Sequence, residues 1–240
     1  MGRVFMSGIV PQKVAPVTFK PNFADNDWST IIKACQTNKV PDTWTVGSQK
    51  TMTINGTDYV IDIIGKNHDD YADGSGKAPL TFQMNRCYNV QYEMGEGGVT
   101  GDRWWNNCVM RKTHLPLILS LMPVEVQNGI KTVSKYTHSN KNSTAGVYSW
   151  EEKLFLLSEV EVMGSVTYSV AGEGSQYAYY AAGNSKIKTF WYNNQYVNIP
   201  WSTRSPSPQN TNKWCHITNQ GASSTDVGTT TYGVSFAFCF

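Results

Sequence analysis

The residues best suited to chemistry lie in one short polar loop, 65–76. It carries several hard oxygen ligands within seven residues, a density typical of calcium-binding loops. These candidate metal ligands are Asn67, Asp69, Asp70 and Asp73. An EF-hand is excluded, because that alignment places Tyr71 and Leu80 at positions that require oxygen ligands. The sequence favours a Gly-rich loop whose Asp side chains bond their own backbone, with an irregular cation site as the alternative.

The sequence contains none of the common catalytic motifs. Adjacent Asp69 and Asp70 would point apart on an extended segment, which makes them a poor acid/base pair. There is no Ser nucleophile elbow, zinc-binding helix motif or phosphate loop. We therefore predict a protein that is not an enzyme and needs no cofactor.

The five cysteines are widely spaced, and no CxxC pair occurs among them. A zinc knuckle is therefore excluded. Free thiols packed in the core of a protein from a reducing compartment are the favoured interpretation. A bridge between Cys215 and Cys239 remains open.

Large aromatic side chains mix with Asn, Gln, Ser and Thr in the segment 189–240. Rigid aromatics beside adaptable amides suit a recognition surface, because aromatics stack on sugar faces while amides and Arg bind hydroxyls. The candidate ligand-binding residues are Trp191, Tyr192, Asn193, Asn194, Tyr196, Arg204, Asn210, Asn212, Trp214 and His216. We expect them on loops at 191–198 and 207–214 and on the rim around His216. Alternatively, the Trp residues belong to the core and Arg204 clamps backbone carbonyls.

Bulk properties narrow the class of protein. The chain has 240 residues, of which 40% are hydrophobic and 16% charged, which is typical of a globular protein. A net charge of +2 provides no field that gathers phosphates, so nucleic acid is not an expected partner. No apolar run approaches the about 18 residues of a membrane span, and we expect neither membrane insertion nor a signal peptide.

The predicted elements describe an N-terminal arm followed by one domain. Residues 1–22 contain three prolines and form an extended arm that lies on its own domain or on a neighbouring subunit. Residues 23–240 form the single domain. Helices are expected at 27–38, near 115–122 and at 176–182. Strands are expected at 50–54 and 59–64 around an Asn55-Gly56 turn, and at 79–84, 130–137 and 230–240. Residues 158–162 alternate and indicate a strand or a helix-to-strand switch.

Three groups of residues together carry a resemblance to a known family. They are Asn67-His68-Asp69-Asp70 with Asp73-Gly74-Ser75-Gly76-Lys77 and Thr81-Phe82-Gln83-Met84; Met110-Arg111 with Leu115-Pro116 and Leu121-Met122-Pro123; and Trp201-Ser202-Thr203-Arg204-Ser205-Pro206 with the terminal Gly233-Val234-Ser235-Phe236-Ala237-Phe238-Cys239. Over residues 25–240 the chain resembles an uncharacterised domain family of bacterial surface proteins, phages and prophages. Its C-terminal motifs also resemble C-type-lectin-like folds, including sulfatase-modifying-type domains and variable phage receptor-binding proteins. The resemblance implies an α+β, C-type-lectin-like fold, with a small twisted antiparallel sheet flanked by helices and long loops.

The resemblance also implies a function. We expect a non-enzymatic phage virion protein, such as a tail-fibre tip, a receptor-binding protein or a head decoration, that binds a host-surface glycan or protein. Its arm would contact other virion subunits, and the protein would be a homo-oligomer, made in the host cytoplasm and released by lysis. A purely structural virion subunit and a bacterial surface adhesin are the alternatives. Lectin-like enzymes that oxidise a target Cys use paired thiols, which Cys215 and Cys239 match by residue type alone.

Overall fold

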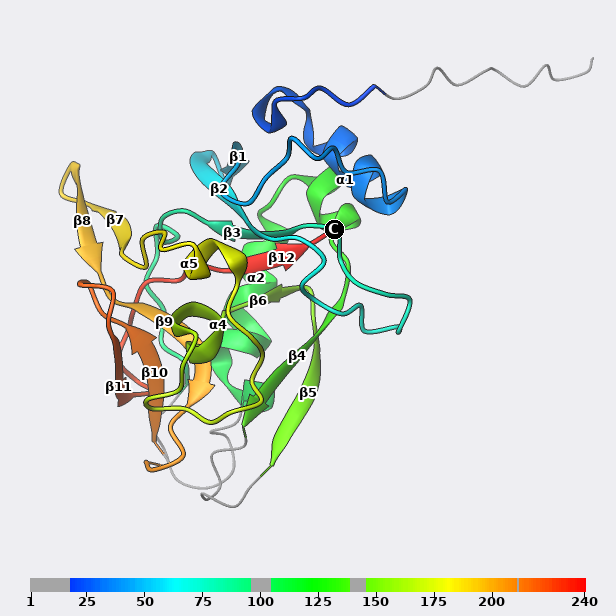
Figure 1. Cartoon of the computed structure of the whole chain (residues 1–240). Helices are drawn as coiled ribbons and strands as arrows, with labels where there is room; N and C mark the ends of the chain where they lie inside the picture. Colours follow the sequence, from blue (N-terminus) through cyan, green and yellow to red (C-terminus); the bar gives the residue numbers. More distant parts are fainter. Residues whose placement is uncertain (1–17, 96–104, 139–145, 211) are drawn as a thin grey trace, which may run out of the picture.

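A five-stranded antiparallel sheet lies at the centre of the computed structural model, which describes residues 18–95, 105–138, 146–210 and 212–240 (Figure 1). In spatial order its strands are β1 (Gln49–Ile54), β2 (Thr57–Gly65), β3 (Thr81–Met84), β12 (Ala237–Cys239) and β6 (Leu154–Phe155). The predicted arm falls mostly outside the described residues, as does most of the glycine-rich segment 95–101. Among the described residues, no helix is long and apolar enough to cross a membrane.

The Asn55-Gly56 turn sets the register of β1 against β2. Both residues have positive φ, 47° and 75°, the backbone that a two-residue hairpin turn of this kind requires. Ile54 and Thr57 pair directly across the turn. The prediction of a hairpin here is confirmed, and the buried strand predicted at 79–84 is confirmed as β3.

The C-terminal strand is shorter and more deeply buried than its pattern predicts. Only Ala237–Cys239 forms regular pairs, with β3 on one side and β6 on the other. Phe236 and Phe238 are fully buried, and so is the alternate residue Ser235. Because β12 lies between β3 and β6 and is covered on both faces, neither of its sides meets solvent. The ring of Phe238 stacks on that of Phe82 at 5.2 Å.

Helices cover the sheet where the sequence predicted them. Asp27 caps α1 (Trp28–Gln36), because its side chain accepts a hydrogen bond of 2.7 Å from the Thr30 N–H. The second predicted helix is divided at its prolines, as short helices flank Pro123 and a π-helical turn precedes Pro116. These elements are η3 (Met110–His114), α2 (Leu115–Ser120) and α3 (Val124–Gly129). Two short 3-10 turns, η1 (Phe23–Asp25) and η2 (Trp105–Asn107), precede α1 and η3 in the chain.

The segment 158–162 is a helix, so the prediction of a strand or a switch was wrong. Ser158 and Glu161 form a capping box at the start of α4 (Glu159–Met163), in which each side chain bonds the backbone N–H of the other. The Ser-x-x-Glu spacing is the sequence signature of a helix start. The alternation covers only five residues, which is too short to identify a strand. The helix predicted at 176–182 is confirmed as α5 (Ala178–Ala181), which ends before Gly183 at φ 85°.

Three smaller antiparallel sheets complete a mixed α+β fold. They pair β4 (Val133–His138) with β5 (Val147–Glu152), β7 (Lys188–Tyr192) with β8 (Gln195–Ile199), and β9 (Trp201–Pro206) with β10 (Lys213–Ile217) and β11 (Ser223–Val227). Residues 191–198 therefore form a hairpin and not the expected loop. Residues 201–206 form a strand in which every residue is buried.

The capping box generates a test of the fold. Ser158→Ala should lower the free energy of unfolding by about 1–2 kcal/mol, because a buried N–H at the start of α4 loses its acceptor. Ser29→Ala on the exposed side of α1 is the matched control and should change stability by less than about 0.5 kcal/mol. Urea unfolding of both variants measures the difference, and equal stabilities would contradict the role of the cap.

Candidate functional site

Five charged side chains meet in the interior and form what we call the ionic cluster. They come from the Asp-rich loop, β4, α4, the segment before α5, and β9, and each is at most 4% exposed. Its members are Asp69, Lys135, Glu161, Glu173 and Arg204. Because charged groups stay buried only when paired and hydrogen-bonded, the geometry of this cluster is a constraint on the whole fold.

Glu161 lies at the middle of the cluster and bridges two cations. Its Oε1 lies 2.6 Å from Lys135 Nζ, and its Oε2 lies 2.5 Å from Arg204 Nη1. Lys135 Nζ also lies 2.6 Å from Asp69 Oδ1. Burial opposes ionisation of Glu161, but Arg204 and Lys135 outweigh it and hold the pKa of Glu161 below its usual value.

Arg204 uses its whole guanidinium in structural contacts. Besides two bonds to Glu161, it donates to the carbonyl oxygens of Tyr136, Leu156 and Glu173. These bonds match the five N–H donors that a guanidinium has. The alternative interpretation of Arg204 as a clamp on backbone carbonyls is confirmed, and its assignment to a ligand surface was wrong.

Glu173 is the acid of the cluster without a cation at ion-pair distance in the described structure. Its carboxylate accepts a 2.7 Å bond from the His138 N–H and bonds the Ser205 hydroxyl. Burial raises the pKa of Glu173 to about 7, since these hydrogen bonds only partly offset the loss of water.

The Asp-rich loop does not gather its acids around a metal. Asp73 accepts bonds from the Ser75 N–H and hydroxyl, at 2.9 and 2.6 Å, as the favoured interpretation predicts. Asp70 makes an exposed ion pair with Lys77, whereas Asp69 points inward. The predicted divergence of Asp69 and Asp70 is therefore confirmed. Among the described residues, no group of three His, Cys, Asp or Glu side chains is placed to hold a metal.

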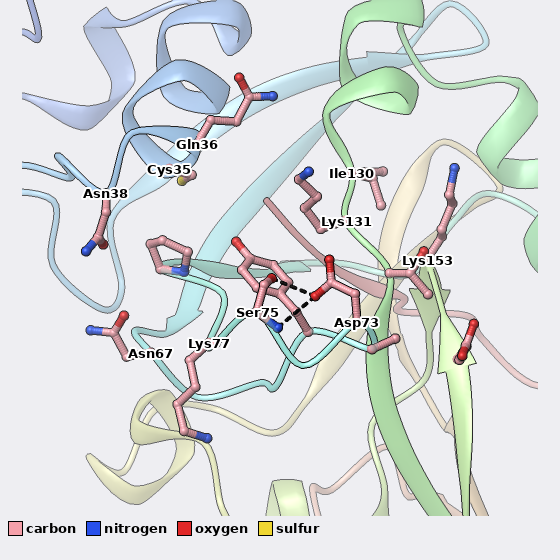
Figure 2. A pocket seen from close by; sticks show the side chains of 16 residues that line it. Cys35, Gln36, Asn38, Asn67, Asp73, Ser75, Lys77, Ile130, Lys131 and Lys153 are labelled. Carbon is pink, nitrogen blue, oxygen red and sulfur yellow. Dashed lines mark hydrogen bonds between the residues drawn. The ribbon is translucent and has the colours of Figure 1, made fainter.

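A groove of about 1200 Å³ lies beside this loop, and the sequence held no signal for it (Figure 2). Its walls come from the end of α1, the Asp-rich loop including Asn67, and the segments flanking β4 and β5. Charged side chains of both signs line it, namely Asp73, Lys77, Lys131, Glu151 and Lys153. In Figure 2 Asp73 is bonded to Ser75, so that carboxylate is occupied by the loop itself.

All five cysteines are free and buried, including Cys215 in β10 and Cys239 in β12. Burial raises the pKa of each thiol, to about 12 at Cys35, Cys87 and Cys108. Thiolates are the reactive form, so burial of this kind makes a thiol inert.

The predicted recognition residues divide into an exposed and a buried group. Trp191, Tyr192 and Tyr196 are 46%, 57% and 55% exposed, which is unusual for such large side chains. Asn193 and Asn194 form the turn between β7 and β8, with φ of 48° and 60°. We call these five residues the hairpin surface. Figure 1 shows this hairpin projecting from one edge of the molecule.

The hairpin surface has one ordered aromatic pair. Trp191 and Tyr196 lie directly opposite each other in the register of β7 and β8. Their ring centroids are 4.8 Å apart and the rings meet edge to face, a favourable arrangement for two aromatics. Phe190 points to the opposite side and is buried, which anchors the strand. The pair is thus held in place while its rings stay exposed to solvent.

Trp214 and His216 are buried, so their assignment to the contact surface was wrong. Trp214 is 5% exposed and belongs to the main core, as the alternative interpretation of the Trp residues had it. His216 is 7% exposed and packs against the ring of Tyr232 at 4.4 Å, and burial lowers the pKa of His216. Asn210 and Asn212, between β9 and β10, are exposed but lie apart from the hairpin in the sequence. Residues 214–217 are all buried, so β10 is covered on both faces, and residue type alone did not indicate this.

Removing the central carboxylate should be much more destabilising than removing an exposed one. Glu161→Gln leaves Lys135 and Arg204 buried without their shared counter-ion, so we expect a loss of about 3–5 kcal/mol in the free energy of unfolding. Asp70→Asn, the matched acid-to-amide control, breaks only the exposed pair with Lys77 and should cost at most about 1 kcal/mol. Similar losses, measured by denaturant unfolding, would exclude a structural role for the cluster.

Glu173 should make stability fall as pH rises. Its folded pKa of about 7 exceeds the usual 4.5, so its stabilising effect is complete below 4.5 and is lost as pH rises through 7. The loss amounts to roughly 3 kcal/mol for this group. Glu173→Gln cannot titrate and should gain stability relative to the unmodified protein between pH 5 and pH 8. Denaturant unfolding at both pH values tests this, and a constant difference would contradict it.

The comparisons with known proteins give one match. Residues 85–240 match the family described as a domain of unknown function, DUF6273. The match includes the hairpin surface and four members of the ionic cluster, all except Asp69. It begins at residue 85, whereas the sequence motifs predicted a resemblance from residue 25. No curated protein and no solved structure matches the chain. With most of its length matched, the chain belongs to the DUF6273 family.

Proposed function

We propose that this protein is a non-enzymatic binding module whose contact surface is the hairpin surface. The observation that carries the proposal is the exposure of Trp191, Tyr192 and Tyr196 on a hairpin whose base is anchored in the protein. Leaving large apolar rings in water is unfavourable, and contiguous exposed apolar groups are typical of interaction sites.

A saccharide is the ligand class that fits this surface best. The faces of Trp and Tyr rings offer apolar area at a small cost in side-chain entropy, since each has only two rotatable bonds. Asn193 and Asn194 beside them provide amide donors and acceptors for hydroxyl groups. A host-surface protein is the second ligand class, because the same residue types are enriched in protein interfaces.

The biological setting follows from the resemblance of the sequence motifs to phage and bacterial surface domains. The protein is then a virion component such as a tail-fibre tip, receptor-binding protein or head decoration, with a C-type-lectin-like fold. Its N-terminal arm contacts other virion subunits, and the protein acts as a homo-oligomer. The mixed α+β fold with several small antiparallel sheets is consistent with this setting.

Two other roles would use the same hairpin differently. A purely structural subunit would pack Trp191 and Tyr196 against a neighbouring subunit, and a bacterial adhesin would present them from a cell surface. Solvent accessibility of the hairpin in the assembled particle separates the structural role from the binding role.

Removing the exposed ring pair should abolish binding without unfolding the protein. Trp191→Ala combined with Tyr196→Ala removes two half-exposed rings that pack partly on each other and not in the core, so the thermal midpoint should stay within a few degrees. Binding to host cells and to a glycan array should fall at least ten-fold. Trp214→Ala is the contrasting variant and should lose about 3–5 kcal/mol of stability, because it empties part of the core.

A different pattern would overturn the proposal. If the double variant unfolds, the hairpin belongs to the structural framework. If it stays folded and binds host cells and glycans as well as the unmodified protein, the contact surface lies elsewhere.

A further inference from the structure

Arg86 lies at the base of the hairpin surface, although no sequence motif pointed to it. The Cys87 N–H donates a 2.9 Å bond to the Thr189 carbonyl oxygen, which fastens the segment after β3 to β7. The Arg86 guanidinium carbon lies 5.3 Å from the Tyr196 ring centroid and 4.2 Å from that of Tyr59. Arg86 is therefore a cation in contact with two aromatic rings, one of which belongs to the hairpin surface.

This guanidinium has only part of the hydrogen bonding that it needs. Its Nη2 donates a 2.7 Å bond to the Asp58 carbonyl oxygen, but its Nη1 is buried and makes no hydrogen bond within the described structure. The Asp58 carboxylate instead accepts a bond from the Thr53 hydroxyl at 2.6 Å. Among the residues that the structure describes, no carboxylate lies within ion-pair distance of Arg86.

The other arginines that the structure describes, Arg204 and Arg111, each have the carboxylate partner that Arg86 lacks. Arg204 satisfies its whole guanidinium and pairs with Glu161, and Arg111 pairs with Glu152 at 2.6 Å. A half-buried cation that has no counter-ion, and whose buried Nη1 has no acceptor, is costly to the free protein. Its position beside exposed aromatics indicates that the missing acceptor comes from a ligand.

We infer that the hairpin surface binds an acidic saccharide, whose carboxylate pairs with Arg86 while a sugar ring stacks on the Trp191–Tyr196 pair. This inference rests on the proposed function and names the ligand class of that same site. The planar fork of Arg matches a carboxylate with two parallel hydrogen bonds, a geometry that a lysine cannot provide. The Tyr196 ring is about half exposed and lies 5.3 Å from the guanidinium carbon, so a sugar that stacks on this ring comes close to Arg86.

The charges of the protein favour a direct contact between Arg86 and a carboxylate, and not a long-range attraction of anions to the whole molecule. The net charge of the whole chain is only +2, so little long-range steering is available. Lys188, the first residue of β7, is also a cation, but it is buried and donates to the Met84 carbonyl oxygen at 2.7 Å. Arg86 is the cation that the described structure places against a ring of the hairpin surface, so selectivity should depend on this side chain.

The test compares acidic sugars with their neutral counterparts. The probes are sialyllactose with lactose, and oligogalacturonate with its methyl ester, which keeps the rings but removes the charge. Titrations followed by tryptophan fluorescence should show that the protein binds at least one acidic member ten-fold or more tightly than its neutral partner. Arg86→Gln should reduce that affinity to the neutral level, whereas Arg86→Lys should keep part of the preference.

Controls separate failure of this inference from failure of the proposed function. Lys33→Gln removes one positive charge from the exposed face of α1, far from the hairpin in Figure 1, and should leave binding unchanged. Equal binding of acidic and neutral partners, with Arg86→Gln unchanged, overturns the acidic ligand but keeps the hairpin as a sugar site. If no probe distinguishes the unmodified protein from the Trp191→Ala, Tyr196→Ala double variant, both proposals fail. Thermal melts verify folding, and if Arg86→Gln unfolds, the Arg86→Lys titrations decide.

Discussion

The Glu161 carboxylate is the interaction on which the rest of the structure depends. It joins Lys135 of β4 to Arg204 of β9, and it also accepts the Ser158 N–H at the start of α4. Each of these groups is buried, so each would be costly without the others. Such a network specifies one arrangement of its segments, because any slip leaves a charge in the interior without a partner.

The ionic cluster also determines where the hairpin surface projects. β9 carries Arg204 and follows β8 after one intervening residue, so fixing β9 fixes the base of the hairpin. The indole N–H of Trp201 donates to the Lys186 carbonyl oxygen at 2.9 Å, which holds the segment that leads into β7. The exposed rings of Trp191 and Tyr196 therefore stand on a rigid base, and preorganisation of this kind reduces the entropy lost on binding.

Aromatic residues serve two physical purposes in this protein. One group fills the centre, where Phe82, Phe238 and Phe240 pack ring against ring around β12. The other group stays in water on β7 and β8, beside a guanidinium that lacks a counter-ion. Residue type alone is the same in both groups, so only burial distinguishes a packing ring from a ring available to a ligand.

The sequence by itself determined the features that depend on local chemistry. The cap at Asp27, the Asn55-Gly56 turn and the end of α5 at Gly183 follow from residues a few positions apart, and the prediction of Trp191 and Tyr196 as exposed survives in the structure. Tertiary structure alone decided the burial of Arg204, since its partner Glu161 lies 43 residues away. It also decided the position of Arg86, whose aromatic neighbours come from distant strands. Burial and charge pairing depend on segments that meet only in the folded chain, and residue spacing does not encode those meetings.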